Sequence, residues 1–130
     1  MGGALIAALD AALAQSGEDI ILRRVIGAAP NLANIDVRCR ARVDAMSVEQ
    51  IAAGIPATDL NLIMSPTEIN EAQWPGGTVP QLPPFNIDQR VPRENGPDKV
   101  IVRGQLRQVA RSKPFIVGGE LVRLELRVSG

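Results

Sequence analysis

The 130-residue chain has no histidine and no tyrosine, and its aromatic residues are one tryptophan and two phenylalanines. Histidine is the commonest acid, base and metal ligand near neutral pH, so its absence removes many catalytic and metal-binding arrangements. Proteins that bind single-stranded nucleic acid stack the bases on aromatic side chains, so this composition argues against that class. The core must be built from valine, isoleucine, leucine and alanine instead.

Cysteine is nearly absent as well, because Cys39 is the only one and no internal disulfide can form. Cys39 lies in an alternating apolar row, which predicts a buried, inert thiol rather than a nucleophile. The phosphate-binding, serine-hydrolase and zinc-protease motifs are missing from the chain. We therefore expect no enzyme, no cofactor and no bound metal. A small hydrolase with unrecognised carboxylates is the alternative.

Long apolar runs are also lacking. The run Ala4–Ala14 contains Asp10 and is shorter than the ~20 residues that a membrane-spanning helix needs. We therefore expect no membrane partner.

Charge is balanced over the whole chain but not along it. Residues 1–74 carry nine acidic and five basic groups, whereas residues 75–130 carry five acidic and nine basic groups. Opposite charges in the two halves suit association with further copies of the chain, although so few charges can also divide unevenly by chance. Twelve of the fourteen bases are arginine, which forms forked pairs with carboxylates and phosphates and favours interfaces.

The chain begins with a predicted helix over residues 3–16. Leu5, Leu9 and Leu13 recur every four positions, and Gly17 is a natural stop. A helix with so little charge is not expected to stand alone in water. It either packs on the rest of the chain or docks on a partner.

Alternation of apolar and polar residues predicts strands at Asp19–Ile26 and, more clearly, at Asn34–Asp44. One face of the second strand is apolar throughout. Its other face carries three arginines, which are Arg38, Arg40 and Arg42. They form a ladder about 13 Å long. This ladder is either a solvated face neutralised by acidic neighbours or a wall toward DNA or an acidic subunit.

Two capping boxes predict short helices. The first is Ser47–Gln50, with serine at the N-cap position and glutamine three residues later. After a strand at Asp59–Met64, Ser65–Glu68 has the same spacing, so Glu68 is expected to act as a capping residue. Residues 19–74 would thus form the first part of a barrel or sandwich.

Residues 75–98 are different in kind, because they hold six prolines and three glycines without any period. So long an irregular segment is uncommon in a compact domain and is usually functional or disordered. Its apolar residues favour a loop ordered only by contact with neighbouring subunits over a simple flexible insertion. The candidate inter-subunit residues are Val79, Leu82, Phe85, Ile87, Arg90 and Arg93.

Residues 99–130 predict further strands and a terminal hairpin. The expected order is Lys99–Arg103, Gly104 as a bulge or tight turn, Gln105–Arg111, Phe115–Val117, a Gly118-Gly119 turn and Glu120–Val128. In the last strand the residues expected to face the core are Val122, Leu124, Leu126 and Val128. Those expected to face outward are Leu121, Arg123, Glu125 and Arg127.

Together these patterns predict a single domain, residues 1–130, of mainly β class. We expect a small β-barrel or sandwich of about six strands, with an N-terminal helix, short helices and a long Pro-rich loop.

Several segments carry a family resemblance. They are the leading helix that ends in Gly17-Glu18-Asp19, the run S-P-T-E-I-N before Trp74-Pro75, and the closing V-x-V-R-G and P-F-x-V-G-G-E-L-V-R-L-E-L-R-V-S-G. With their order, the chain resembles the small head–tail connector proteins of tailed bacteriophages. It is similar to the head-completion or stopper group, the family of the lambda head–tail joining protein. The resemblance covers most of the chain, and the longer, Pro-rich insert at 75–98 departs from it.

The resemblance implies a structural protein of the virion neck, assembled in the bacterial host cytoplasm. Copies of such a protein form a six- or twelve-fold ring below the portal or adaptor ring. This ring closes the channel around duplex DNA and offers a platform to tail terminator or tail-tube proteins.

Carried onto this chain, the resemblance makes 75–98 the candidate gate or clasp loop. Candidates for the channel or the subunit interface are Arg38, Arg40, Arg42, Arg123 and Arg127. Gly118 and Gly119 become candidates for contact with the next ring. The alternatives are a tail terminator or another neck ring and, from another class, a free small β-barrel module that binds nucleic acid.

Overall fold

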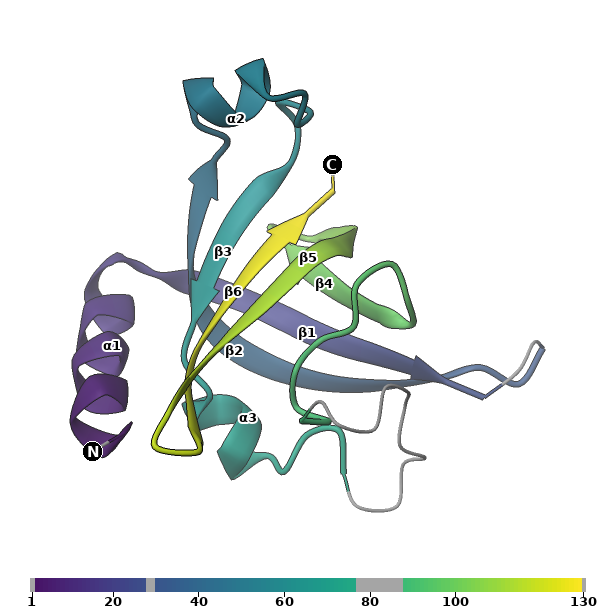
Figure 1. Ribbon diagram of the computed structural model, residues 1–130. Helices are drawn as coiled ribbons and strands as arrows, with labels where there is room; N and C mark the ends of the chain where they lie inside the picture. Colours follow the sequence, from purple (N-terminus) through teal and green to yellow (C-terminus); the bar gives the residue numbers. More distant parts are fainter. Residues whose placement is uncertain (1, 28–29, 77–87, 130) are drawn as a thin grey trace.

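The computed structural model describes residues 2–27, 30–76 and 88–129, which form an antiparallel barrel closed in the order β1-β2-β3-β6-β5-β4 (Figure 1). The strands are β1 (Glu18–Ile26), β2 (Ala33–Ala45), β3 (Leu60–Met64), β4 (Asp98–Val102), β5 (Gln105–Val117) and β6 (Glu120–Val128). The helices are α1 (Gly2–Ser16), α2 (Val48–Ala52) and α3 (Thr67–Glu71). The expected mainly β fold of about six strands with a leading helix is confirmed, and it is a barrel rather than a sandwich.

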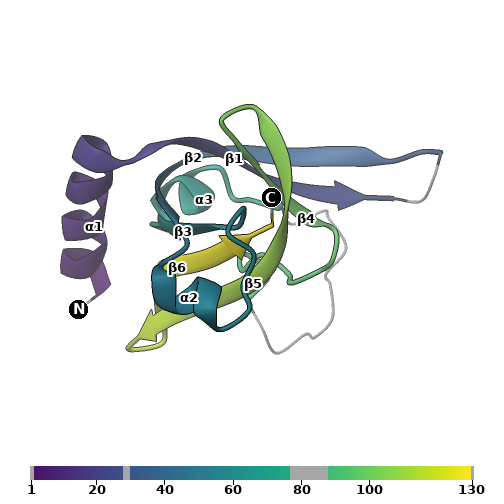
Figure 2. The same cartoon turned by 90° about the horizontal axis from the view of Figure 1, so that it is seen from above.

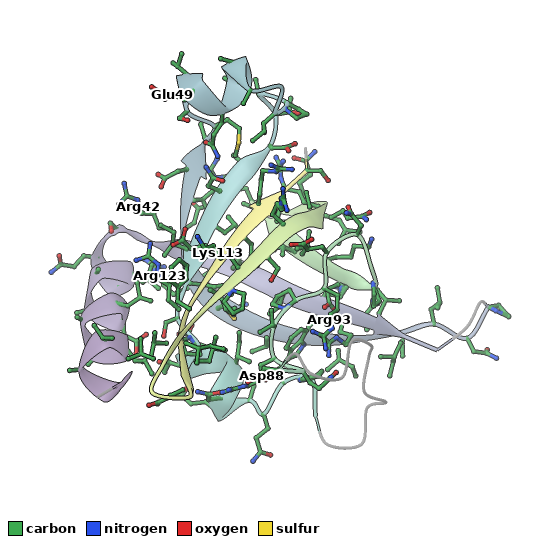
Figure 3. All side chains as sticks on the ribbon, in the orientation of Figure 1. Arg42, Glu49, Asp88, Arg93, Lys113 and Arg123 are labelled. Atoms are coloured by element: carbon green, nitrogen blue, oxygen red, sulfur yellow. The ribbon has the colours of Figure 1, made fainter. Side chains whose placement is uncertain are left out.

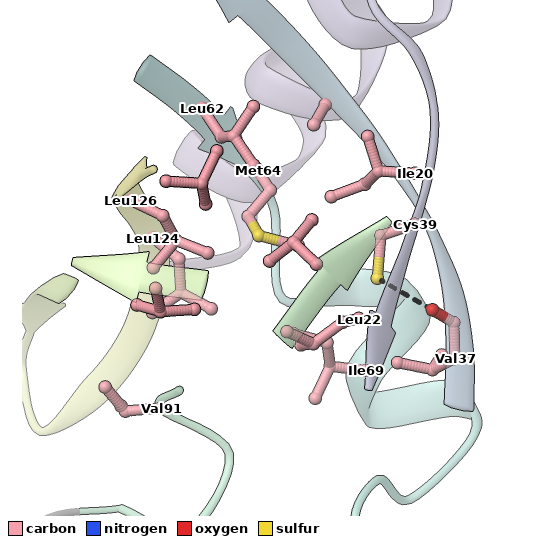
Figure 4. Close-up of a cluster of buried hydrophobic side chains, with 14 of the residues drawn as sticks. Ile20, Leu22, Val37, Cys39, Leu62, Met64, Ile69, Val91, Leu124 and Leu126 are labelled. Carbon is pink, nitrogen blue, oxygen red and sulfur yellow. Dashed lines mark hydrogen bonds between the residues drawn. The ribbon is translucent and has the colours of Figure 1, made fainter. Parts of the chain in front are cut away.

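Aliphatic side chains fill the interior of the barrel (Figure 4). The most completely enclosed, each with no exposed surface, include Leu22, Leu62, Met64, Val100 and Leu124. Full burial of one such side chain contributes roughly 1.5–3 kcal/mol to the free energy of unfolding. The interior of the barrel is therefore a packed core.

Strand β2 has the predicted alternation. Val37, Cys39 and Ala41 are buried, whereas Arg38 and Arg42 are exposed. The Cys39 thiol lies near the Val37 carbonyl in the core (Figure 4). Burial, with a smaller contribution from the Glu68 carboxylate, raises the pKa of this thiol to about 12, so the predicted buried thiol is confirmed.

The structure confirms the first predicted capping box, but the prediction of the second is wrong. Ser47 accepts a hydrogen bond from the Gln50 N–H, and the Gln50 side chain accepts one from the Ser47 N–H. At α3 the N-cap residue is Pro66, which makes no side-chain capping bond, and the Ser65 hydroxyl accepts from the Thr67 N–H at 3.2 Å. Proline has no N–H to donate in the reciprocal bond, and Glu68 instead accepts a hydrogen bond from the Arg40 N–H of β2 at 2.9 Å.

The segment around α3 lies against the part of β2 that β3 does not reach. Strand β3 pairs only with residues 41–45 of β2. Farther along β2, the Glu68 carboxylate accepts from the Arg40 N–H, and the Trp74 indole N–H donates to the Ile35 carbonyl at 2.8 Å. Side-chain hydrogen bonds thus continue the pairing of β2 where the strand ladder stops.

Two register shifts correct the expected pattern of the last strands. Strand β5 runs continuously, and its pairing with β6 skips Ala110 between Val109 and Arg111. The pairing skips Val122 of β6 between Phe115 and Ile116 of β5. Leu121 is therefore buried in the core with 2% exposure, where a regular alternation predicts an outward side chain.

Both predicted glycine turns are present. Gly104 belongs to a tight turn with Arg103 rather than a bulge, and both residues have positive φ angles, 52° and 78°. Gly118 and Gly119, with φ angles of 59° and 79°, form the two-residue turn between β5 and β6. Two successive positive φ angles match the right-handed twist of a hairpin.

Helix α1 stands at one side of the barrel, opposite the direction in which the β1–β2 hairpin extends (Figure 2). Leu13 is its buried anchor with 3% exposure, and the Leu13 carbonyl accepts hydrogen bonds from the Gly17 N–H and the Arg40 side chain. Leu5, nearer the start of the helix, is 51% exposed. The helix therefore packs on the barrel yet leaves much apolar surface uncovered. In the described residues, no helix is both long and apolar enough to cross a membrane.

The segment 88–97 differs from the expectation of a loop ordered only by neighbouring subunits. Val91 and Arg93 are buried, the Asn95 N–H donates to the Val109 carbonyl, and Glu94 accepts from the Ser112 N–H. This part of the insert is held by its own barrel.

Candidate interaction surfaces

Within the residues that the structure describes, no group of three or more Cys, Asp and Glu side chains is arranged to hold a metal ion.

The three arginines of β2 do not form a free cationic wall. The Arg40 side chain donates to the Leu13 carbonyl at 3.0 Å and lies 3.4 Å from Asp19, while Arg42 pairs with Asp44 at 3.1 Å. Arg38 remains exposed beside β1 and the Arg103-Gly104 turn. Of the two interpretations of the ladder, the solvated face with acidic neighbours describes Arg40 and Arg42.

The two outward arginines of β6 are also paired. Arg123 lies 3.0 Å from Glu125, and Arg127 lies 3.5 Å from Asp59. Arg123 and Lys113 also flank the Phe115 ring, at 5.5 and 5.1 Å from its centroid. Arg42, Lys113 and Arg123 lie on the side of the barrel nearest α1 (Figure 3). The structure thus brings Arg123 to a cationic rim around an aromatic ring.

The arginines predicted for the gate loop bind within the chain. Arg90 donates to Asp88 and to Asn70 of α3, and this contact lowers the pKa of the Asp88 carboxyl. Arg93 is buried, and its main-chain N–H donates to Asp98 at 2.6 Å. In Figure 3 Asp88 lies near α3 in the lower part of the view, and Arg93 lies higher, at the level of β1. The other candidates of this loop, Val79, Leu82, Phe85 and Ile87, lie outside the described residues.

A buried ion pair that the sequence did not reveal joins β1 and β4. Arg24 donates two hydrogen bonds to Asp98, at 2.8 and 2.9 Å, and both side chains have no exposed surface. The Arg24 guanidinium also stacks on Trp74, 4.7 Å from the ring centroid. Arg24 belongs to the inward face of β1, where the alternation alone predicts an apolar residue, and that break in the alternation was the available signal.

An apolar groove lies between α1 and the β5–β6 hairpin. Its volume is about 230 Å³. It is lined by Leu5, Leu9, Phe115, Val117, Val122 and Arg123. The bulge at Val122 places this side chain toward the groove while Leu121 enters the core. The predicted Gly118-Gly119 contact turn is exposed at the end of the same hairpin.

Helix α2 is a second unpartnered apolar feature. Val48 is 79% exposed and Ile51 is 46% exposed, and no residue of the helix is buried. The two side chains are three residues apart and so share one face of the helix. Their three-residue spacing after Ser47 was visible in the sequence, but only the structure shows that no described residue buries this face.

No protein-family model matches the chain, and a search of curated proteins found no match.

Proposed function

We propose that the chain is a structural protein of the neck of a tailed bacteriophage or phage-like particle. Copies form a ring between the portal or adaptor ring and the tail. This ring closes the DNA channel and serves as the platform for tail attachment. A tail terminator or another neck ring is the neighbouring alternative, since it would share the fold and the assembly behaviour.

The observation that supports the proposal most is where the large exposed apolar side chains lie. They are Leu5, Leu32, Val48, Ile51, Leu106, Ile116 and Val117. These residues belong to α1, α2 and the ends of hairpins, while the barrel between them is closed and packed. Clustered exposed apolar residues mark protein contacts, and a rigid barrel with contact sites at its extremities suits a subunit of a larger assembly.

The arginine pairs favour assembly over free binding to nucleic acid. Carboxylates lie within ion-pair distance of six outward arginines, which are Arg23, Arg40, Arg42, Arg103, Arg123 and Arg127. Affinity for duplex DNA comes largely from cations that replace its counterions. Arginines already paired with carboxylates are poor replacements.

The test is affinity purification of the tagged chain from its source during particle production, with partners identified by mass spectrometry. The proposal expects portal or adaptor proteins together with tail proteins. Recovery with tail-tube proteins but no portal or adaptor would favour a tail terminator. Recovery alone, or with cellular DNA and no virion protein, would overturn the neck assignment.

A further inference from the structure

Helix α2 is a knob that no residue in the described part of the chain covers. The capping box fixes its first turn, and the Gln50 side chain also accepts a hydrogen bond from Asn61 of β3 at 3.0 Å. The helix therefore has a defined position, yet Val48 and Ile51 remain exposed side by side. A single exposed apolar residue is ordinary on a protein surface, but two on one fixed helical turn form a contact face.

The groove between α1 and the β5–β6 hairpin has the size for such a knob. Its volume of about 230 Å³ is below the roughly 300–1,000 Å³ of small-molecule sites. Leu5 and Val117 line it and are 51% and 37% exposed. Aliphatic side chains from another protein surface fit this space better than a cofactor does.

The charges of the two features are complementary. Glu49 is exposed between Val48 and Ile51, and it is the only charged residue in the segment 45–58. Arg123 lines the groove, and Lys113 lies near the same Phe115 ring. Glu125 pairs with Arg123, so two cations and one carboxylate leave this rim with a net positive charge. An acidic knob thus faces a cationic rim when the two surfaces meet.

The two features lie at opposite ends of the barrel, so one chain cannot join them within itself. Strand β6 runs from Leu121, beside the groove, to Val128, which pairs with Leu60 at the α2 end. That length is about 23 Å at the rise of a strand. Figure 1 shows α2 above the barrel and the β5–β6 turn below it, beside α1.

We infer that α2 of one copy seats in the groove between α1 and the β5–β6 hairpin of the next copy. Val48 and Ile51 enter the apolar groove, and Glu49 meets Lys113 and Arg123 at its rim. The contact uses different surfaces on the two copies, and a head-to-tail contact of this kind generates rings where its rotation closes. The inference rests on the proposed function, because it names the subunit contact of the proposed ring.

The first test is cysteine cross-linking between two single-site variants, one of them carrying an affinity tag. Tagged Val48→Cys and untagged Val117→Cys are mixed at about 1 mM, on the order of the effective concentration of two sites joined by a short flexible linker, and oxidised. The Cys39 thiol is buried and should form no disulfide in either variant. We expect a mixed disulfide dimer from this pair and none from the control pair of Val48→Cys with Leu32→Cys, whose leucine is 57% exposed on the β1–β2 hairpin. Equal cross-linking of both pairs, or none of either, would overturn the inference.

The second test is charge reversal at the rim. Glu49→Lys should weaken self-association about tenfold, the effect of a contact worth about 1.4 kcal/mol, and Lys113→Glu in the same chain should restore most of it. Sedimentation velocity measures the association, and circular dichroism verifies that each variant is folded. Loss of association without restoration by Lys113→Glu would contradict the pairing of these two surfaces.

These outcomes separate the interface from the proposed function. If virion neck proteins co-purify with the wild-type chain while the Val48–Val117 cross-link is absent, the interface is wrong and the neck assignment stands. If the cross-link forms but no virion protein co-purifies, the interface stands and the neck assignment fails.

Discussion

Asp98 is the residue whose loss should disturb the fold most. Its carboxylate accepts two hydrogen bonds from Arg24 and one from the Arg93 N–H in a fully buried site. Asp98→Ala leaves the Arg24 charge buried without its carboxylate, so we expect a loss of about 3–5 kcal/mol in the free energy of unfolding. Urea unfolding followed by circular dichroism measures it.

The exposed pair of Arg23 and Asp36 is the matched control. It has the same forked geometry, with distances of 2.8 and 3.0 Å, but it lies at the surface. Asp36→Ala should cost about 1 kcal/mol or less. Equal losses in Asp98→Ala and Asp36→Ala would show that burial adds nothing to the inner pair.

Glu68 should destabilise the fold when it is ionised. Burial raises the pKa of its carboxyl, and the Asp10 and Glu71 carboxylates add to the effect, while the hydrogen bond from Arg40 opposes it. A raised pKa in the folded state means that the penalty is present above that pKa and absent below the unfolded value near 4.3.

Glu68→Gln keeps an oxygen for the Arg40 N–H and removes the charge. We expect its melting temperature to exceed that of the wild type at pH 7, with the difference shrinking as the pH falls toward about 4. Differential scanning calorimetry across this range checks it. A difference that is constant with pH would show that the charge of Glu68 is not responsible.

Cys39 should react with thiol reagents only when the barrel opens. Its side chain is 1% exposed, and its pKa is raised to about 12, so the thiolate that attacks such reagents is scarce near neutral pH. Labelling with a maleimide at pH 7 should be slow in buffer and fast in denaturant. Fast labelling of the native protein would mean that β2 separates from its neighbours frequently.

The β5–β6 turn requires glycine at its second position. Gly119 has a φ angle of 79°, and a Cβ there would meet nothing within 4 Å, so backbone strain alone opposes a larger residue. Gly119→Ala should lower the free energy of unfolding by roughly 1–2 kcal/mol. Thermal unfolding at low protein concentration measures it.

Gly3 of α1 is the control for this change. A Cβ there also meets nothing within 4 Å, but the residue is helical. Gly3→Ala should therefore leave the stability unchanged or raise it by up to about 1 kcal/mol. A loss in Gly3→Ala as large as in Gly119→Ala would argue against strain at the turn.

Elements were predictable from the sequence wherever a local pattern determines them. The alternation of β2, the Ser47 capping box and the Gly118-Gly119 turn each involve residues close in the chain. The bulge at Val122 was not predictable, because it depends on how β6 pairs with β5. For the same reason Glu68 was misread as a capping residue, since its partner Arg40 is distant in sequence.

The candidate site residues also divide into those that a local pattern predicts and those that depend on contacts between distant parts of the chain. The sequence identified Arg40, Arg42, Arg123 and Arg127 as outward residues, which the structure confirms for their strands. The partners of Arg42 and Arg123 are two residues away on the same strand face and so lay within reach of the sequence pattern. The partners of Arg40 and Arg127 were not predictable, because those pairs depend on how distant segments are arranged. The groove beside Phe115 combines a helix and a hairpin that lie about a hundred residues apart, so no local pattern indicated it.

The isolated molecule should bind duplex DNA poorly. Its formal net charge is zero, and most of its outward arginines are paired. Nonspecific DNA binders reach dissociation constants of about 10⁻⁴–10⁻⁶ M at physiological salt through cations that are free to contact phosphates. Fluorescence anisotropy with a labelled duplex should show no binding in the micromolar range at about 0.15 M salt. Tight binding that weakens steeply with salt would instead favour the nucleic-acid module.

The hydrogen bonds that Glu68 and Trp74 make to β2 affect what the molecule can recruit. A strand with free main-chain groups is a template on which a foreign peptide can add as a further strand, and it also seeds edge-to-edge aggregation. Here the Arg40 N–H and the Ile35 carbonyl are already occupied. Recruitment by strand addition is therefore blocked at these positions, and substitution of Trp74 should open the edge to aggregation as well as weaken the core.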